Sequence, residues 1–177
     1  MIKAVLFDLF ETLITESPVQ PTRASSLGDA LGLPQEAFRV EWKAWRPRVV
    51  LGQLSFADAL TEISKTLTGR VDAAAVQRIR MQRIREKAAA YAQIDEEILA
   101  LITDLRRHGV GLAVISNCFS EDVLAWSTCP LAREFQCTAF SFAESAAKPA
   151  PEIYLPSCRW GARLIRSVRR LLEFKDK

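Results

Sequence analysis

The stretch Lys3–Ile14 reads KAVLFDLFETLI, an apolar run that ends abruptly at Asp8 and is followed by Thr12. Consecutive apolar residues before a single carboxylate are typical of a buried parallel strand that presents an acid at its tip. In open α/β sheets, ligands bind at the carboxyl ends of the strands. The stretch therefore predicts a strand at residues 4–7 and makes Asp8 the first candidate site residue.

Two later segments have the same character. Residues 111–118 read GLAVISNC, a second apolar strand that ends in Ser116 and Asn117, and residues 147–154 read AKPAPEIY, with a lysine before Pro-x-Pro. Because the carboxyl ends of parallel strands meet at one edge of a sheet, the polar residues at these ends should lie together. Five side chains are expected at this edge: Asp8, Thr12, Ser116, Asn117 and Lys148.

In this order, with a long insert between the first two, the three segments resemble the first three motifs of the haloacid dehalogenase superfamily. The resemblance covers about residues 1–154. It implies an α/β fold with a Rossmann-like parallel sheet and an all-helical cap that is inserted after the first motif and closes over the active site. The function that it implies is that of a hydrolase acting on a small anionic substrate.

In this family the aspartate of the first motif is a covalent nucleophile, so the resemblance assigns that role to Asp8. Its carboxylate would attack phosphorus or carbon, and water would then split the acyl-phosphate or ester intermediate. Lys148 would balance the charge of this carboxylate and neutralise the transferred group. Ser116 would donate hydrogen bonds to phosphate oxygens, Asn117 would orient the substrate or the loop, and Thr12 would fix the loop after the nucleophile.

One departure from the family's phosphatases lies two residues after the nucleophile. The phosphatases carry a second aspartate there as general acid and base, but this chain has Phe10. An aromatic residue at this position is found in members that resemble the metal-free dehalogenases. Phe10 cannot transfer a proton, which removes a contribution typically worth about 10²–10⁴-fold in rate. Its carbonyl, together with the Asp8 carboxylate, would still offer oxygen ligands to Mg²⁺.

A second departure concerns the family's fourth motif, an apolar strand ending in aspartates that completes the Mg²⁺ site of the phosphatases. The residues printed after Tyr154 contain no such segment. Mg²⁺ prefers near-octahedral oxygen coordination, so Asp8 and Phe10 begin a site that other acids would have to complete. The candidates are Glu11, Glu121, Asp122 and Glu144, although nothing in their spacing favours them.

Three interpretations therefore stay open. The first is a hydrolase of phosphate monoesters, the activity of most members of the family. The second is a metal-free hydrolase of 2-haloacids, which the phenylalanine after the nucleophile favours. The third is a catalytically impaired or truncated member that keeps the fold and acts by interaction. Fold resemblance alone does not decide among them, because function depends on the site.

The bulk composition is that of an ordinary globular protein. The chain has 177 residues, of which 49% are hydrophobic and 25% charged, enough for one good core. No apolar run is long enough to span a bilayer. The four cysteines show no C-x-x-C spacing, and we interpret them as reduced thiols of a cytoplasmic protein. The only histidine, His108, stands before a glycine at a helix end, so no Cys–His nucleophile pair is evident.

The pattern along the chain divides it into three parts. Residues 22–92 have helical spacing throughout, with Ser55 predicted to cap a helix at 56–67 and Asp72 preceding one at 73–91. We therefore predict an α/β core at residues 1–17 and 93–156, a helical cap at 18–92 and a tail at 157–177. Within the second part of the core, Ser120 is expected to cap a short helix, and residues 137–142 are expected to form a third strand.

The tail carries seven basic and two acidic residues, a local charge of 7 − 2 = +5. Its apolar residues have helical spacing, which predicts a basic amphipathic helix. Without a fourth strand, residues 4–7 would form an open edge of the sheet, so we expect the tail to pack on the core or the chain to form a homodimer there. The basic residues are confined to this helix without a reading motif, which argues against nucleic acid as a partner.

Overall fold

The structure, a computed structural model, describes residues 2–16 and 24–154. A parallel sheet with the strand order β1-β2-β3 lies at its centre. The strands are β1 (Ala4–Phe7), β2 (Gly111–Ser116) and β3 (Cys137–Phe140). In the register, Phe7 lies opposite Val114, and Ser116 lies opposite Phe140. The prediction of an α/β fold with a parallel sheet is confirmed.

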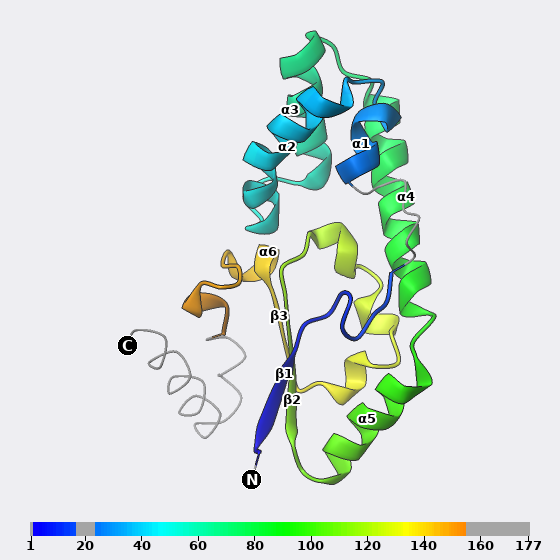
Figure 1. Ribbon diagram of the computed structural model, residues 1–177, viewed down its shortest axis with the longest axis vertical. Helices are drawn as coiled ribbons and strands as arrows, with labels where there is room; N and C mark the ends of the chain where they lie inside the picture. Colours follow the sequence, from blue (N-terminus) through cyan, green and yellow to red (C-terminus); the bar gives the residue numbers. More distant parts are fainter. Residues whose placement is uncertain (1, 17–23, 155–177) are drawn as a thin grey trace.

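The first four of the five described α-helices between β1 and β2 form the helical insert, by which we mean α1–α4. Their bounds are α1 (Ala24–Ala30), α2 (Gln35–Val50), α3 (Phe56–Thr68) and α4 (Ala73–Tyr91). In Figure 1 the helical insert stands beyond the carboxyl ends of the strands, and α4 runs back along it toward the sheet. The division into a cap at residues 18–92 and a core around it stays a prediction.

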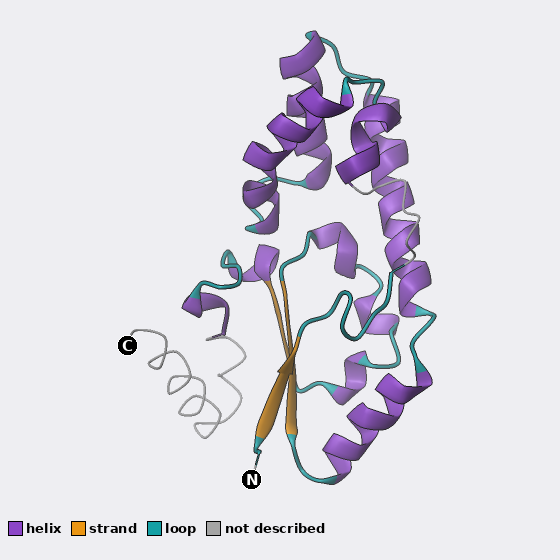
Figure 2. Cartoon of the chain, viewed as in Figure 1, coloured by secondary structure: helices purple, strands orange, loops and turns teal. Residues whose placement is uncertain are grey.

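The remaining elements of the sheet region are mostly short. They are α5 (Glu96–Arg107), the 3₁₀ helices η1 (Ser120–Val123), η2 (Trp126–Thr128) and η3 (Ala132–Glu134), α6 (Ser141–Glu144) and the 3₁₀ helix η4 (Pro151–Tyr154). Figure 2 shows how loops and short helices, rather than long ones, dominate this half of the molecule. The basic tail at 157–177 lies outside the described residues.

Alternating strand residues separate two apolar clusters on the two faces of the sheet. Leu112 and Val114 of β2 face the larger cluster, where they pack with Ile102 of α5 and with Trp126. Ile115 faces a smaller cluster on the opposite side. A third cluster fills the interior of the helical insert. The sheet region and the helical insert therefore each have an apolar core of their own.

Most helix boundaries follow the predicted signals. Ser55 accepts a hydrogen bond from the Asp58 amide at 3.0 Å, and Asp72 caps α4 in the same way through Ala75 at 2.9 Å. The prediction for Ser120 was wrong, because Phe119 occupies the cap position of η1 and its amide donates to the Asp122 carboxylate. The third strand also ends two residues earlier than predicted, since α6 begins at Ser141.

A glycine lets the helical insert touch the sheet region. Gly52, in the turn between α2 and α3, has φ +68° and lies against the carbonyl oxygen of Phe142 in α6. A β-carbon at Gly52 would clash with that carbonyl, and the positive φ itself favours glycine. This contact brings the carboxyl end of α2 to the segment that immediately precedes the lysine loop.

Among the described residues, no helix is both long and apolar enough to cross a membrane.

Candidate functional site

An aspartate–lysine ion pair marks the carboxyl edge of the sheet. Asp8 follows β1 directly, and its Oδ2 lies 2.7 Å from the Nζ of Lys148. The Asp8 Oδ1 accepts a hydrogen bond from the Leu9 amide at 2.8 Å. The side chains keep 44% and 26% of their surface exposed, respectively. A paired carboxylate that remains open to solvent can be reached by a substrate, whereas a buried pair cannot.

Asn117 holds the lysine loop in place by a two-way contact. Its Nδ2 donates to the carbonyl of Lys148 at 3.0 Å, and the Lys148 amide donates to its Oδ1 at 2.7 Å. Both bonds involve the Lys148 backbone, so Asn117 fixes the position of the main chain at Lys148 and does not contact the ammonium group. The role expected for Asn117, orienting the substrate or the loop, stays a prediction to which these bonds lend support.

Ser116 and Thr12 complete the set that the sequence predicted at this edge. Ser116 is the last residue of β2 and is 1% exposed. Thr12 is exposed in the loop after β1, where Leu13 and Ile14 both donate to the carbonyl of Leu9. The structure thus joins Asp8, Asn117 and Lys148 by direct contacts and places Ser116 at the end of the neighbouring strand. The roles assigned to Ser116 and Thr12 stay predictions.

Two of the four acids suggested to complete a magnesium site, Glu121 and Asp122, form ion pairs with α4. Glu121 and Asp122 are buried, and they pair with Arg80 at 3.0 Å and Arg83 at 2.7 Å. Within residues 2–16 and 24–154, no three His, Cys, Asp or Glu side chains cluster as metal ligands would. Mg²⁺ also keeps water ligands and often binds only one or two carboxylates, so the site begun by Asp8 and Phe10 stays a prediction.

The ring of Phe10 faces a buried lysine. The Nζ of Lys87 lies 4.0 Å from the centre of the Phe10 ring, and Tyr91 packs on the ring from 6.2 Å. Lys87 also forms an ion pair with Glu16, in which the side chains are only 6% and 11% exposed. The position of the phosphatases' second aspartate is therefore apolar and is covered by a cation from α4.

Sequence reasoning missed three cationic residues of α4 that pair with core acids. Arg80, Arg83 and Lys87 bind Glu121, Asp122 and Glu16, respectively, and so tie α4 to the loops after β2 and β1. The signal was their spacing of i, i+3 and i+7, which places them on one side of a helix. On a helix of low overall hydrophobicity, the same spacing is equally typical of a solvent-exposed charged face. The spacing alone therefore did not predict these ion pairs.

The buried cysteine beside the Ser-Asn sequence is not a nucleophile. Burial, and secondarily the negative charge of Asp122, raises the pKa of the Cys118 thiol to about 12. Burial also raises the pKa of Cys129. Since the thiolate is the reactive form, Cys118 is inert near neutral pH. This agrees with the absence of a Cys–His pair that the sequence indicated.

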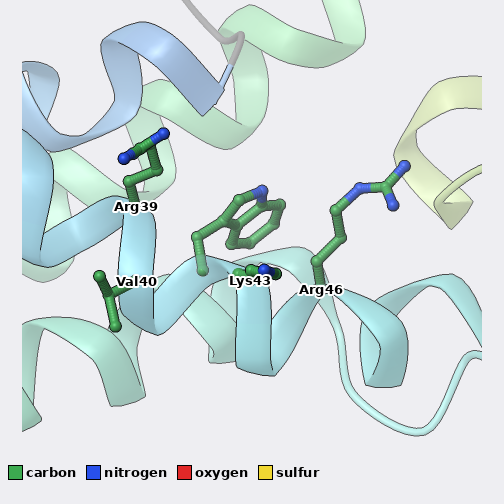
Figure 3. A pocket seen from close by; sticks show the side chains of 5 residues that line it. Arg39, Val40, Lys43 and Arg46 are labelled. Atoms are coloured by element: carbon green, nitrogen blue, oxygen red, sulfur yellow. The ribbon is translucent and has the colours of Figure 1, made fainter.

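A basic groove runs along α2 on the helical insert. It has a volume of about 450 Å³ and is lined by Arg39, Val40, Trp42, Lys43 and Arg46. In Figure 3 the guanidinium of Arg46 extends away from α2 toward the faint yellow ribbon of the sheet region. Arg39 is already paired with Glu36 at 2.6 Å. The groove gives the helical insert a positively charged surface.

The fold is that of an α/β protein whose candidate site lies at the carboxyl edge of a parallel sheet. A sequence model of the haloacid dehalogenase-like hydrolases matches residues 2–159, so the chain belongs to that family. This confirms the resemblance that the three motifs carried. No significant match to a protein of curated function was found.

Solved structures show the same fold. A structure described as a predicted HAD-like family hydrolase of Porphyromonas gingivalis is similar with a TM-score of 0.61 and 21% identity, over 88% of this chain and 74% of that one. A HAD family enzyme of Bacteroides thetaiotaomicron has a TM-score of 0.60 and 19% identity, over 87% and 75%. Its complex with magnesium and inorganic phosphate has a TM-score of 0.56 and 20% identity, over 88% and 76%.

Proposed function

We propose that this hydrolase cleaves a small anionic substrate, first of all a phosphate monoester, through a covalent intermediate on Asp8. The observation that carries the proposal is the half-exposed pair of Asp8 and Lys148, whose charged atoms lie 2.7 Å apart at the end of β1. A carboxylate in this position can attack, and an adjacent ammonium offsets the charge that accumulates on the transferred group.

The proposed reaction has two steps. An Asp8 oxygen attacks phosphorus, the bond from phosphorus to the ester oxygen breaks, and the departing alkoxide takes its proton from solvent. Water then attacks the acyl-phosphate, which releases phosphate and restores the carboxylate. In this scheme Lys148 balances charge in both steps, Asn117 holds its loop, and Ser116 donates to the transferred group. The helical insert acts as the cap, and its basic groove on α2 favours anionic substrates.

A second candidate is displacement of halide from a 2-haloacid. The observation in its favour is Phe10, whose ring is packed between Lys87 and Tyr91 and offers no proton to a leaving group. A halide departs as a stable anion and needs no general acid, whereas an alkoxide benefits from one. Here Asp8 would attack carbon, halide would leave, and water would hydrolyse the resulting ester.

Assays on aryl phosphates with Mg²⁺ or a chelator, and on 2-haloacids without added metal, separate the candidates. We expect wild-type turnover on the phosphate panel and none by Asp8→Asn, because an amide is a poor nucleophile. Asp104→Asn is the matched control, since this acid lies 65% exposed on α5. Turnover of haloacids alone would favour the second candidate. An intact fold without activity on either panel would contradict catalysis and favour a protein that acts by interaction.

We also propose a cytoplasmic location and a small-molecule partner rather than nucleic acid. The support is chemical: Cys118, Cys129 and Cys137 are free thiols in the described part of the chain, as in proteins of reducing compartments. The expectation of a homodimer rests on the open edge of β1 in the described sheet. Measuring the mass of the protein in solution tests it.

A further inference from the structure

We infer that Phe119 and Arg83 are positioning residues that couple the helical insert to the lysine of the site. The inference deepens the proposed function, since it rests on Asp8 and Lys148 as the reacting pair. Phe119 lies two residues after Asn117, in the loop that follows β2. It nevertheless packs into the apolar cluster of the helical insert and is 5% exposed.

Three contacts hold the Phe119 ring inside the insert. It stacks on Phe56 of α3 with ring centres 5.8 Å apart and planes at 20°, and it meets Trp42 of α2 edge to face at 5.9 Å. The guanidinium of Arg83 lies 4.7 Å from its ring centre and 5.2 Å from that of Phe56. A residue of the sheet region is thus part of the core of the insert.

An ion pair and two hydrogen bonds hold the same loop against α4. The Nε of Arg83 binds Asp122 Oδ1 at 2.7 Å, and Asp122 Oδ2 accepts the backbone N–H of Phe119 at 2.9 Å. Tyr91, at the end of α4, donates its hydroxyl to the Asp122 carbonyl at 2.9 Å. Asp122 and Arg83 are only 4% and 12% exposed. α4 therefore sets the position of both the side chain and the backbone at residue 119.

The other end of this short loop fixes the position of the Lys148 backbone. From Phe119 the chain runs back through Cys118, whose backbone N–H and carbonyl are both bound by the buried hydroxyl of Ser141 at 3.1 Å. The next residue is Asn117, which makes two hydrogen bonds with the backbone of Lys148. Figure 1 shows η1, which begins right after Phe119, lying between the strand ends and the helical insert. A displacement of the insert is therefore transmitted over two peptide units to the site.

The chain offers a matched pair of variants to test this coupling. Phe119 and Phe56 stack on each other and share Arg83, so Phe119→Leu and Phe56→Leu remove the same ring stack from the same cluster. Only Phe119 is joined through the backbone to Asn117. If Phe119 has only a structural role, the two variants should affect the Lys148 backbone equally. If Phe119 is a positioning residue, only Phe119→Leu should loosen the Lys148 backbone.

The reporter is hydrogen exchange of the Lys148 amide, which donates to Asn117. After correction for the free energy of unfolding of each full-length variant, we expect Phe119→Leu to speed this exchange about tenfold or more, and Phe56→Leu to leave it unchanged. Where turnover is measurable, Phe119→Leu should lower kcat with little change in KM. Equal effects of both variants on Lys148 exchange, or no effect of either, would overturn the inference. This readout needs no substrate, so it stands apart from the assays of the proposed function.

Discussion

Two lysine–carboxylate pairs take their acids from the segment that follows β1, and they differ in exposure. Lys148 pairs with Asp8 where both side chains remain open to solvent, at 26% and 44%. Lys87 pairs with Glu16 where both are nearly enclosed, at 6% and 11%. Both acids belong to the same segment, β1 and the loop that follows it. We propose that the open pair meets a ligand, whereas the closed pair holds α4 against that loop.

The comparison shows that charge pairing alone does not mark a functional site. An open pair exchanges partners at low cost, because water solvates whichever charge is released. A buried pair cannot, because each ion has lost its water and depends on the other. Substitutions of the two lysines should therefore separate cleanly into an effect on chemistry and an effect on stability.

The largest effect should follow loss of the closed pair. Lys87→Met keeps the length of the side chain but leaves Glu16 buried without its cation, which should lower the free energy of unfolding by about 3–5 kcal/mol. Denaturant titration followed by circular dichroism measures it. The double variant Lys87→Met/Glu16→Leu should regain most of the loss, because an apolar pair needs no counter-charge. A single variant as stable as wild type would mean that the pair is solvated.

The open pair should respond in the opposite way. Lys148→Met should lower turnover about 10²–10³-fold, as expected when one preorganised electrostatic contact to the reacting group is removed. Its unfolding midpoint should stay close to that of wild type, because the Asp8 carboxylate regains water. Steady-state kinetics and a denaturant titration on the same preparation give both quantities. A large loss of stability with unchanged turnover would reverse the assignment of the two pairs.

The sequence predicted the open pair and missed the closed one for a physical reason. Asp8, Asn117 and Lys148 each follow an apolar strand or stand in a Pro-rich loop, and parallel strands bring such ends together whatever the rest of the chain does. Lys87 lies near the end of α4, where a cation is normally solvated, and only the packing of α4 against distant loops buries it. The burial of Phe119 was missed for a similar reason, because it depends on long-range packing against the helical insert.

Helix starts show the same division between local signals and long-range contacts. Local signals placed α3 and α4 well, because Ser55 and Asp72 act through their own neighbours at the helix start. They failed at Ser120, where a long-range pair of Asp122 with Arg83 decides the geometry of the turn. The acids suggested for Mg²⁺ were misjudged for the same reason. Glu121 and Asp122 are available to a metal only if the arginines of α4 are ignored.

The smallest effect concerns Cys118, which follows Asn117 in the sequence but is buried like the closed pair. Its pKa is raised from an ordinary value of 9.0 to about 12 by burial first and by Asp122 second. The folded protein thus keeps this proton at a pH where the unfolded chain releases it. The resulting stabilisation is complete below about pH 9 and is lost as the pH rises toward 12, so stability should fall across this window.

Cys118→Ala isolates this contribution. Between pH 9 and 10 the free energy of unfolding of wild type should fall by about 1 kcal/mol more than that of the variant, since one pKa unit corresponds to about 1.4 kcal/mol. Tyr91, whose pKa burial also raises, is present in both proteins, so its contribution cancels in this comparison. Urea titrations at both pH values measure the difference. Parallel pH profiles would show that the thiol ionises as readily in the folded protein as in the unfolded chain, and that solvent reaches the interior beside Asn117.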